Sequence, residues 1–418
     1  MHSECEDRVE RLIQKGVTIP NPGSVLIGDD VSLDRIAGDG VVIHPGCKIF
    51  GEKTLIMSGA KLGYEGPVTV EDCQIGPNVE LKGGFFRRST FLEKANVGPG
   101  AQVRDGCVLE EEANGAHTVG LKQTILFPFV TLGSLINLCD CFMAGGASRK
   151  NHSEGGSSYI HFNYTPNQDK ATPSLIGDVP RGVMLKQSPI FLGGQGGLVG
   201  PVRVEYGTVI AAGVICRKDV LDGGSLVLDC TSISERSNYS PGVYWHVRNR
   251  VINNMNYVAN LIALRHWYLT VRSRFFKGDD AMGLYEGVMD KLDISIRERI
   301  ERFRVLAEKM PESARRYQAI VKKEANQRLL RQKHELFDRW HDLEAVFSNG
   351  LENQGDPSMR EPFLEQLNEQ TKEKGAGYVA VIQGLDKAWS AKGTEWLQGI
   401  MDAINEQAFQ IMPSYRHE

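Results

Sequence analysis

Apolar residues recur at every sixth position in the first half of the chain, with glycine, proline, aspartate and asparagine between them. The longest unbroken run is Leu192, Leu198, Val204, Ile210 and Cys216. A period of six fits neither an amphipathic helix nor an ordinary hairpin. It is typical of a hexapeptide solenoid, in which each face of a triangular coil is one short strand with one aliphatic side chain pointing inward. The pattern therefore predicts a mainly β solenoid over residues 21–230.

The pattern changes near Pro241. The 45 glycines crowd into the first part of the chain, whereas the remainder is rich in Leu, Glu, Arg, Gln and Ala, with apolar residues at three- and four-residue spacings. We therefore predict an all-α domain, an antiparallel helical bundle, over 242–418. Its expected helices span about 243–276, 279–310, 312–348, 359–373 and 378–411. A short helix is also predicted from Glu4 to Lys15, capped by Gly16, in an N-terminal segment 1–20.

Composition and charge narrow the class of protein. The 418 residues are 41% hydrophobic, enough for a globular core. A net charge of −4 argues against a protein built to coat nucleic acid. Lys and Arg exceed Asp and Glu between Trp245 and Glu335, but the signs interleave as on a solvated helix face. No apolar run is long enough to span a membrane and the N-terminus lacks a secretory signal, so we expect a soluble, cytoplasmic protein.

The cysteines do not form a metal-binding pattern. There are 8 of them, and none stands in a Cys-x-x-Cys pair. A structural zinc site of the ribbon type needs two such pairs. We therefore expect buried, reduced thiols and no metal site.

Several motifs in the first half resemble a known enzyme family. They are the stretch from Leu198 to Val204, the sequence from Arg217 to Val220 and the pair Asn163-Tyr164. Through them residues 4–220 resemble the left-handed β-helix domain of the bifunctional bacterial enzyme that makes UDP-N-acetylglucosamine. The resemblance implies a left-handed parallel β-helix that transfers acetyl from acetyl-CoA to glucosamine 1-phosphate. The chain has no Gly-rich nucleotide loop of the Leu-x-Ala-Gly-x-Gly-Thr-x-Met type, so we expect the family's uridylyltransferase domain to be absent.

The resemblance also implies site residues. Arg104 and Lys122 lie eighteen residues apart, as do two phosphate-binding cations of the family. An Arg fork and a Lys point charge together hold a phosphate in a fixed orientation. The other implied substrate-binding residues are Asn137, Asn163, Tyr164 and Lys170. The acyl-CoA groove is expected along Ser157, Gly194 and Ala212, with serine at the first of these where the family usually has alanine.

The chain departs from the family at the catalytic base. Ser134 stands where the family has the histidine that deprotonates the sugar amine, and Asn137 and Thr165 replace a tyrosine and an aspartate. A serine hydroxyl without a partner cannot act as a base near neutral pH. His152, in a polar segment over 144–158, is the predicted substitute base, with Ser134 as the second candidate catalytic residue. The same segment also reads as a solvated loop, and His117 is a weaker candidate base.

Two classes of function stay open. The first is an acyl-CoA-dependent transferase that acts on an amino sugar phosphate or a UDP-sugar with an altered base. The second is a non-catalytic sugar-nucleotide-binding or scaffold protein, and a third possibility is a partner of a separate uridylyltransferase. The flat outer faces of a solenoid favour packing around a threefold axis, so we expect a homotrimer with ligands between neighbouring coils, and neither nucleic acid nor membrane as partner.

Overall fold

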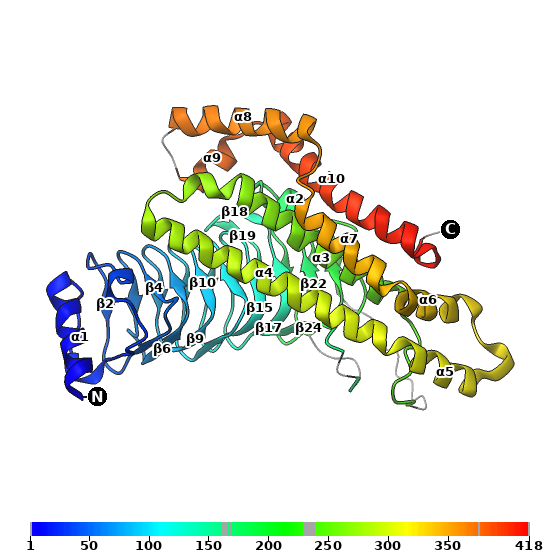
Figure 1. The fold of residues 1–418 in the computed structure, drawn as a ribbon, viewed down its shortest axis with the longest axis horizontal. Coiled ribbons are helices and arrows are strands. Elements are labelled where there is room, and N and C mark those ends of the chain that lie inside the picture. Colours follow the sequence, from blue (N-terminus) through cyan, green and yellow to red (C-terminus); the bar gives the residue numbers. More distant parts are fainter. Residues whose placement is uncertain (1, 161–165, 168, 229–238, 375–376, 417–418) are drawn as a thin grey trace.

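The chain is a long parallel β-solenoid with helices laid along one side (Figure 1). The structure, a computed structural model, describes residues 2–160, 166–167, 169–228, 239–374 and 377–416. The predicted fold class, a mainly β parallel solenoid followed by an all-α region, is confirmed. Helix α1 (His2–Lys15) covers the N-terminal end of the solenoid and ends at Gly16, whose φ of 107° is the left-handed geometry of a helix C-cap.

Each coil of the solenoid contributes strands to three faces, visited in a fixed order. The first face is a 10-stranded sheet of β2 (Val42–Ile43), β5 (Lys61–Leu62), β8 (Glu80–Leu81), β11 (Asn96–Val97), β14 (Asn114–Gly115), β16 (Thr131–Leu132), β20 (Glu154–Gly155), β23 (Phe191–Leu192), β26 (Val209–Ile210) and β28 (Leu226–Val227). The second face holds β1 (Leu26–Ile27), β3 (Lys48–Phe50), β6 (Val68–Glu71), β9 (Gly84–Arg87), β12 (Ala101–Val103), β21 (Tyr159–Ile160), β24 (Gly197–Leu198) and β27 (Ile215–Cys216). The third face holds β4 (Leu55–Ile56), β7 (Gln74–Ile75), β10 (Ser89–Phe91), β13 (Cys107–Leu109), β22 (Ser174–Ile176) and β25 (Arg203–Val204).

Two longer strands pass from the second face to the third. They are β15 (Gly120–Leu126) and β17 (Asn137–Met143), which pair with strands of both faces. Each turns the corner at a residue with left-handed backbone, Gln123 with φ of 50° and Asp140 with φ of 53°. The third corner, between the third and first faces, carries an antiparallel hairpin of β18 (Gly146–Ser148) and β19 (Asn151–His152).

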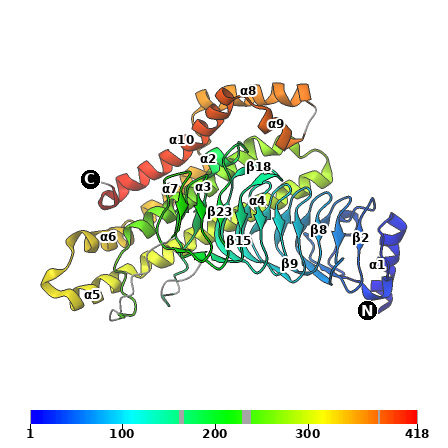
Figure 2. The ribbon, with the colours of Figure 1, turned by 180° about the vertical axis from the view of Figure 1, so that it is seen from behind.

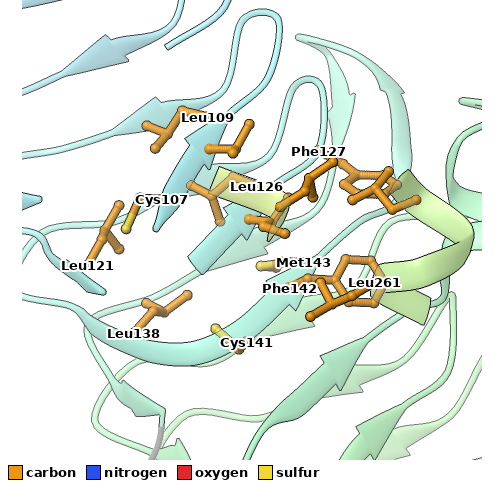
Figure 3. Close-up of a cluster of buried hydrophobic side chains, with 14 of the residues drawn as sticks. Cys107, Leu109, Leu121, Leu126, Phe127, Leu138, Cys141, Phe142, Met143 and Leu261 are labelled. Carbon is orange, nitrogen blue, oxygen red and sulfur yellow. The ribbon is translucent and has the colours of Figure 1, made fainter. Parts of the chain in front are cut away.

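The apolar residues of the six-residue pattern form the core of the solenoid. All five members of the longest run are buried, on β23 to β27 in succession, so the predicted inward positions are confirmed. Figure 3 shows the same arrangement in the middle coils, where Leu109, Leu121, Leu126 and Leu138 point into the prism. Six cysteines are free, and all of them except Cys139 are buried: Cys47, Cys73, Cys107, Cys139, Cys141 and Cys216.

The third face is buried on its outer side as well. Its outward residues Val108, Ile125, Phe142 and Leu175 are almost fully covered. Helix α4 (Asp279–Glu308) runs over β4, β7, β10 and β13, and α3 (Arg248–Thr270) reaches β22. Figure 3 shows Leu261 of α3 beside the phenyl rings of this face. From behind, in Figure 2, the coils from β2 to β15 lie in front with no helix across them.

The remaining helices differ from the prediction in two regions. The expected single helix over 312–348 is wrong, because this segment forms α5 (Met310–Val321), α6 (Gln327–Asp338) and α7 (Trp340–Glu352). Asn326 is the N-cap of α6 and accepts a hydrogen bond from the Leu329 amide at 3.0 Å, which competes with continuation of α5. The expected single helix over 378–411 is wrong as well, because this segment forms α9 (Tyr378–Gly384) and α10 (Lys387–Ile411), with Asp386 as the N-cap of α10. The other helices are α2 (Val179–Gly182) and α8 (Pro357–Lys374).

Candidate functional site

The alternation of side chains along each strand builds two outward columns on the second face. Val103, Leu121, Leu138 and Ile160 point inward and are buried. Outside them, one column consists of Gln102, Gly120, Asn137 and Tyr159, which are register partners on β12, β15, β17 and β21. The next column consists of Arg104, Lys122 and Cys139. Neighbouring strands lie about 4.8 Å apart, so the side chains in each column are close enough to contact one small ligand.

The two columns line a cavity of about 370 Å³. Gly120 creates the space at its centre, since it has no side chain between Gln102 and Asn137. A Cβ atom built at Gly120 would approach no atom closer than the Asn137 side chain, at 3.5 Å. The cavity thus brings together three of the predicted substrate-binding residues, Arg104, Lys122 and Asn137.

The cavity is electrostatically positive at one side. Arg104 and Lys122 are both exposed there, and neither is among the side-chain ion pairs of the described residues. The thiol of Cys139 lies beside them, 3.4 Å from the Asn137 Oδ1 atom. Burial raises the pKa of Cys139 to about 11, with Asp140 adding to the rise and Lys122 and Arg104 opposing it. At neutral pH the thiol is therefore a neutral wall of the cavity rather than a nucleophile.

The predicted cofactor residues form a row along the corner between the first and second faces. The Ser157 hydroxyl donates to the Ser134 carbonyl at 2.5 Å. The Gln195 amide donates to the Ser157 carbonyl at 2.6 Å, and the Gly213 amide to the Gly194 carbonyl at 2.8 Å. Ser134, Ser157, Gly194 and Ala212 therefore follow one another along the corner, starting next to Leu135 and Ile136, which line the cavity. These four residues have small side chains or none, and each is at least partly exposed.

The predicted base lies elsewhere. His152 is on the β18–β19 hairpin, paired with Gly146 at the corner between the third and first faces, and it does not line the cavity. His117 is nearer, because its Nδ1 atom lies 3.4 Å from the hydroxyl of Thr118, a cavity-lining residue. The role of His152 stays a prediction.

Three other predicted substrate residues are not brought into the cavity by the described chain. Asn163 and Tyr164, and with them Thr165, lie outside the described residues. Lys170 is exposed beyond that segment, with a left-handed φ of 55°, and does not line the cavity.

Most of the other lining residues escaped the sequence analysis, among them the column members Gln102, Gly120, Cys139 and Tyr159. These residues can be predicted from the register of the solenoid strands. Residues one position before and after an inward residue point outward from the same strand, and equivalent residues one coil apart share a column. Applied to Arg104 and Lys122, this rule leads to Cys139, and from Asn137 it leads to Tyr159.

Two features are absent from the part of the chain that the structure describes. No group of three or more His, Cys, Asp or Glu side chains is placed there to hold a metal ion. None of the helices described has the length and apolar character needed to cross a membrane.

Comparison with known proteins relates the chain to one enzyme group over about half its length. The bifunctional protein GlmU of Thermotoga petrophila is 29% identical over 214 residues, which are 51% of this chain and 42% of that protein. GlmU of Trichlorobacter lovleyi is 31% identical over 50% of this chain and 40% of its own length, and GlmU of Pelobacter propionicus is 30% identical over 56% and 45%. The chain thus spans less than half the length of these relatives.

Two further comparisons add little. No protein-family model matches the chain. The crystal structure of the polySia-specific acetyltransferase NeuO shares 14% identity over 42% of this chain and 74% of its own, with a TM-score of 0.14, too low to carry an argument. The resemblance found in the sequence is confirmed: half of this chain is similar to the bifunctional GlmU proteins, and the rest of it is not covered by the match.

Proposed function

We propose that the cavity on the second face binds a sugar phosphate and that the protein is an acyl-CoA-dependent acyltransferase of the hexapeptide-repeat type. The observation that carries the proposal is the register of Arg104 and Lys122, one coil apart on the wall of one cavity. A phosphate carries up to two negative charges, and this pair supplies a fork of donors and a point charge. The acceptor is an amino sugar phosphate or a UDP-sugar, as the similarity to GlmU suggests.

The corner row suits the acyl donor. Bound along Ser134, Ser157, Gly194 and Ala212, acyl-CoA supplies a thioester whose C–S bond breaks as the sugar amine forms an amide and the free thiol leaves. The row starts where the cavity begins, at Leu135. Asn137 is placed to bind a sugar hydroxyl, and Arg104 with Lys122 fixes the other end of the acceptor. Orientation of this kind supplies much of the acceleration in a group transfer.

The amine must lose its proton, and no histidine lines the cavity within the described residues. His152 remains the predicted base and His117 is the nearer imidazole. The pH profile of kcat/KM separates them, because replacing the true base by Gln removes the acidic limb near the pKa of histidine and costs about 10²–10⁴-fold in rate. The alternative, a binding protein without turnover, draws on the same observation and on Ser134 at the place of the family's base.

The open faces support a homotrimer. Helices cover the third face, whereas Phe191, Val209 and Leu226 form an exposed, in-register apolar ladder on the first. Leu135, Tyr159 and Ile215 are exposed on the second face. Packing of a first face against a neighbour's second face would bury both sets and close the cavity. Light scattering coupled to size exclusion tests this, with Val209→Lys expected to give monomers.

The function is tested first by thermal unfolding with acetyl-CoA, glucosamine 1-phosphate and UDP-N-acetylglucosamine. A ligand at about 100 times its Kd stabilises by about 2.7 kcal/mol. A shift with both donor and acceptor, followed by thiol release from acetyl-CoA, supports the transferase. A shift with the sugar ligands and no turnover favours the binding protein. No shift with any phosphate-bearing ligand contradicts the proposed site.

A further inference from the structure

One buried arginine of the helical region binds the solenoid beside the cavity. Arg299 of α4 is 2% exposed, and its Nη2 atom lies 2.8 Å from a carboxylate oxygen of Asp140, which is itself 8% exposed. Its Nη1 atom donates to the backbone carbonyl of Lys170 at 3.2 Å. One guanidinium therefore joins two segments of the solenoid that are thirty residues apart in the sequence.

The first of these segments, at Asp140, adjoins the proposed site. Asp140 directly follows Cys139 and comes three residues after Asn137, and both of those residues line the cavity. Lys170 belongs to the short segment that follows the predicted sugar-binding residues Asn163 and Tyr164 along the chain. A shift of Asp140 would therefore change where the side chains of Cys139 and Asn137 point.

The two residues that Arg299 holds also have unusual backbones. Asp140 has a φ of 53° and Lys170 a φ of 55°. Such left-handed conformations are uncommon outside glycine and persist where the surroundings hold them in place. Arg299 contacts both, one through its side chain and the other through its carbonyl.

The segment around Lys170 is also held by other side chains of the helical region. Arg250 and the hydroxyl of Tyr244 bind the buried Asp169 at 3.2 and 2.6 Å, respectively. Asn254 donates to the Ala171 carbonyl at 3.1 Å, and Lys309 donates to the Asn167 carbonyl. The helical region thus fixes the backbone at 167 and over 169–171, and among the contacts of the described residues Arg299 alone links that segment to β17.

We propose that Arg299 is a positioning residue that sets the geometry of the cavity wall, and that through it the helical region controls binding of the sugar phosphate. This use of the cavity rests on the proposed function above. Misaligning the hydrogen bond that Asn137 makes to the ligand is expected to cost up to about tenfold in affinity.

The test compares Arg299→Gln with Arg272→Gln. Arg272 is an equally buried arginine of the helical region, 1% exposed and 2.7 Å from Glu111, and it does not touch the cavity. Both variants lose a buried ion pair, so both are expected to melt at a lower temperature. Only Arg299→Gln is expected to weaken binding of glucosamine 1-phosphate, by up to about tenfold in titration calorimetry, with Arg299→Lys restoring part of the affinity.

Amide hydrogen exchange gives a readout that needs no ligand. Faster exchange in 137–140 and 169–171 in Arg299→Gln, with no such change in Arg272→Gln, supports the positioning role of Arg299. This readout holds even if the wild type binds no sugar phosphate. Absence of binding in the wild type would contradict the proposed function alone. Equal effects of the two variants on exchange and affinity would overturn the inference. If Arg299→Gln does not fold, Asp140→Asn replaces it, since asparagine tolerates left-handed backbone.

Discussion

Arg104 and Lys122 occupy the same position on consecutive coils of the solenoid, with the amide of Arg104 bonded to the carbonyl of Leu121 at 2.8 Å. The eighteen residues that separate them are one full turn of three six-residue faces. Sequence spacing that looks arbitrary in a linear chain therefore becomes direct adjacency in this fold. The pair presents two cations to one cavity, which is what a phosphate monoester requires.

Removing either cation should weaken phosphate binding selectively. Hydrogen bonds to charged groups contribute about 1.5–3 kcal/mol, so Arg104→Ala and Lys122→Ala are each expected to weaken glucosamine 1-phosphate by about 10–100-fold. Titration calorimetry measures the effect. Arg87→Ala is the matched control, because Arg87 lies in the same column one coil earlier, pairs with Asp105 at 2.8 Å and does not line the cavity. A loss of affinity equal to that in Arg87→Ala would contradict the assignment.

Filling the cavity at Gly120 should block the ligand while the fold remains. The backbone there is not left-handed, and an added Cβ has only an ordinary contact with Asn137 at 3.5 Å. Gly120→Ala is therefore expected to melt like the wild type, and Gly120→Phe to fold but to lose the thermal shift caused by glucosamine 1-phosphate. Circular dichroism confirms folding of both variants. Retained binding in a folded Gly120→Phe protein would place the ligand elsewhere.

The sequence pattern was sufficient to predict the solenoid but did not predict that helices cover its third face. The six-residue period marks inward residues such as Leu198 and Val204 because the prism interior admits only apolar side chains. Burial of the third face on both sides is nevertheless visible in the sequence as consecutive apolar residues. Apolar pairs, as in Ile125-Leu126 and Phe142-Met143, recur there because the strand is buried on both sides.

Charged residues at the helix–solenoid contact were the least predictable. Arg272, Lys291 and Arg299 read as members of a solvated, charge-interleaved stretch, yet each is almost fully buried. Their partners Glu111, Gln74 and Asp140 come from the solenoid, more than 150 residues earlier, so local periodicity holds no information about the pairing. The same limit applies to the cavity, where Arg104 and Lys122 followed from a resemblance and Tyr159 only from register.

Truncating an inward residue beneath the cavity should destabilise the solenoid. Leu138 is fully buried between Leu121 and Ile160, and Leu→Ala changes at such sites cost about 2–5 kcal/mol. Urea denaturation of Leu138→Ala measures the loss as a lower midpoint. Leu135→Ala, three residues away and more than half exposed, is expected to change stability by less than about 0.5 kcal/mol. Similar midpoints for the two variants would argue against the inward assignment.

The contact between Glu110 and Tyr268 should make stability depend on pH. Glu110 is buried at the helix-covered corner, with the Tyr268 hydroxyl 2.5 Å away and Arg272 and Glu111 nearby. Burial raises the pKa of Glu110 from an ordinary value of 4.5 to about 7, against the attraction of Arg272 and with a contribution from Glu111. The folded protein therefore holds this proton more tightly than the unfolded chain does.

The sign of the effect follows from linkage. A group whose folded pKa is raised contributes its stability in full below about pH 4.5 and loses it as the pH rises to about 7. Glu110→Gln keeps an acceptor for Tyr268 but cannot ionise, so its stability should match the wild type at pH 4.5 and exceed it at pH 8, by about 1–3 kcal/mol. Urea midpoints across this range measure the difference. Glu111→Gln, which removes the partner of Arg272, should instead destabilise at pH 8. A Glu110→Gln protein that tracks the wild type at every pH would show that folding leaves the pKa of Glu110 unchanged.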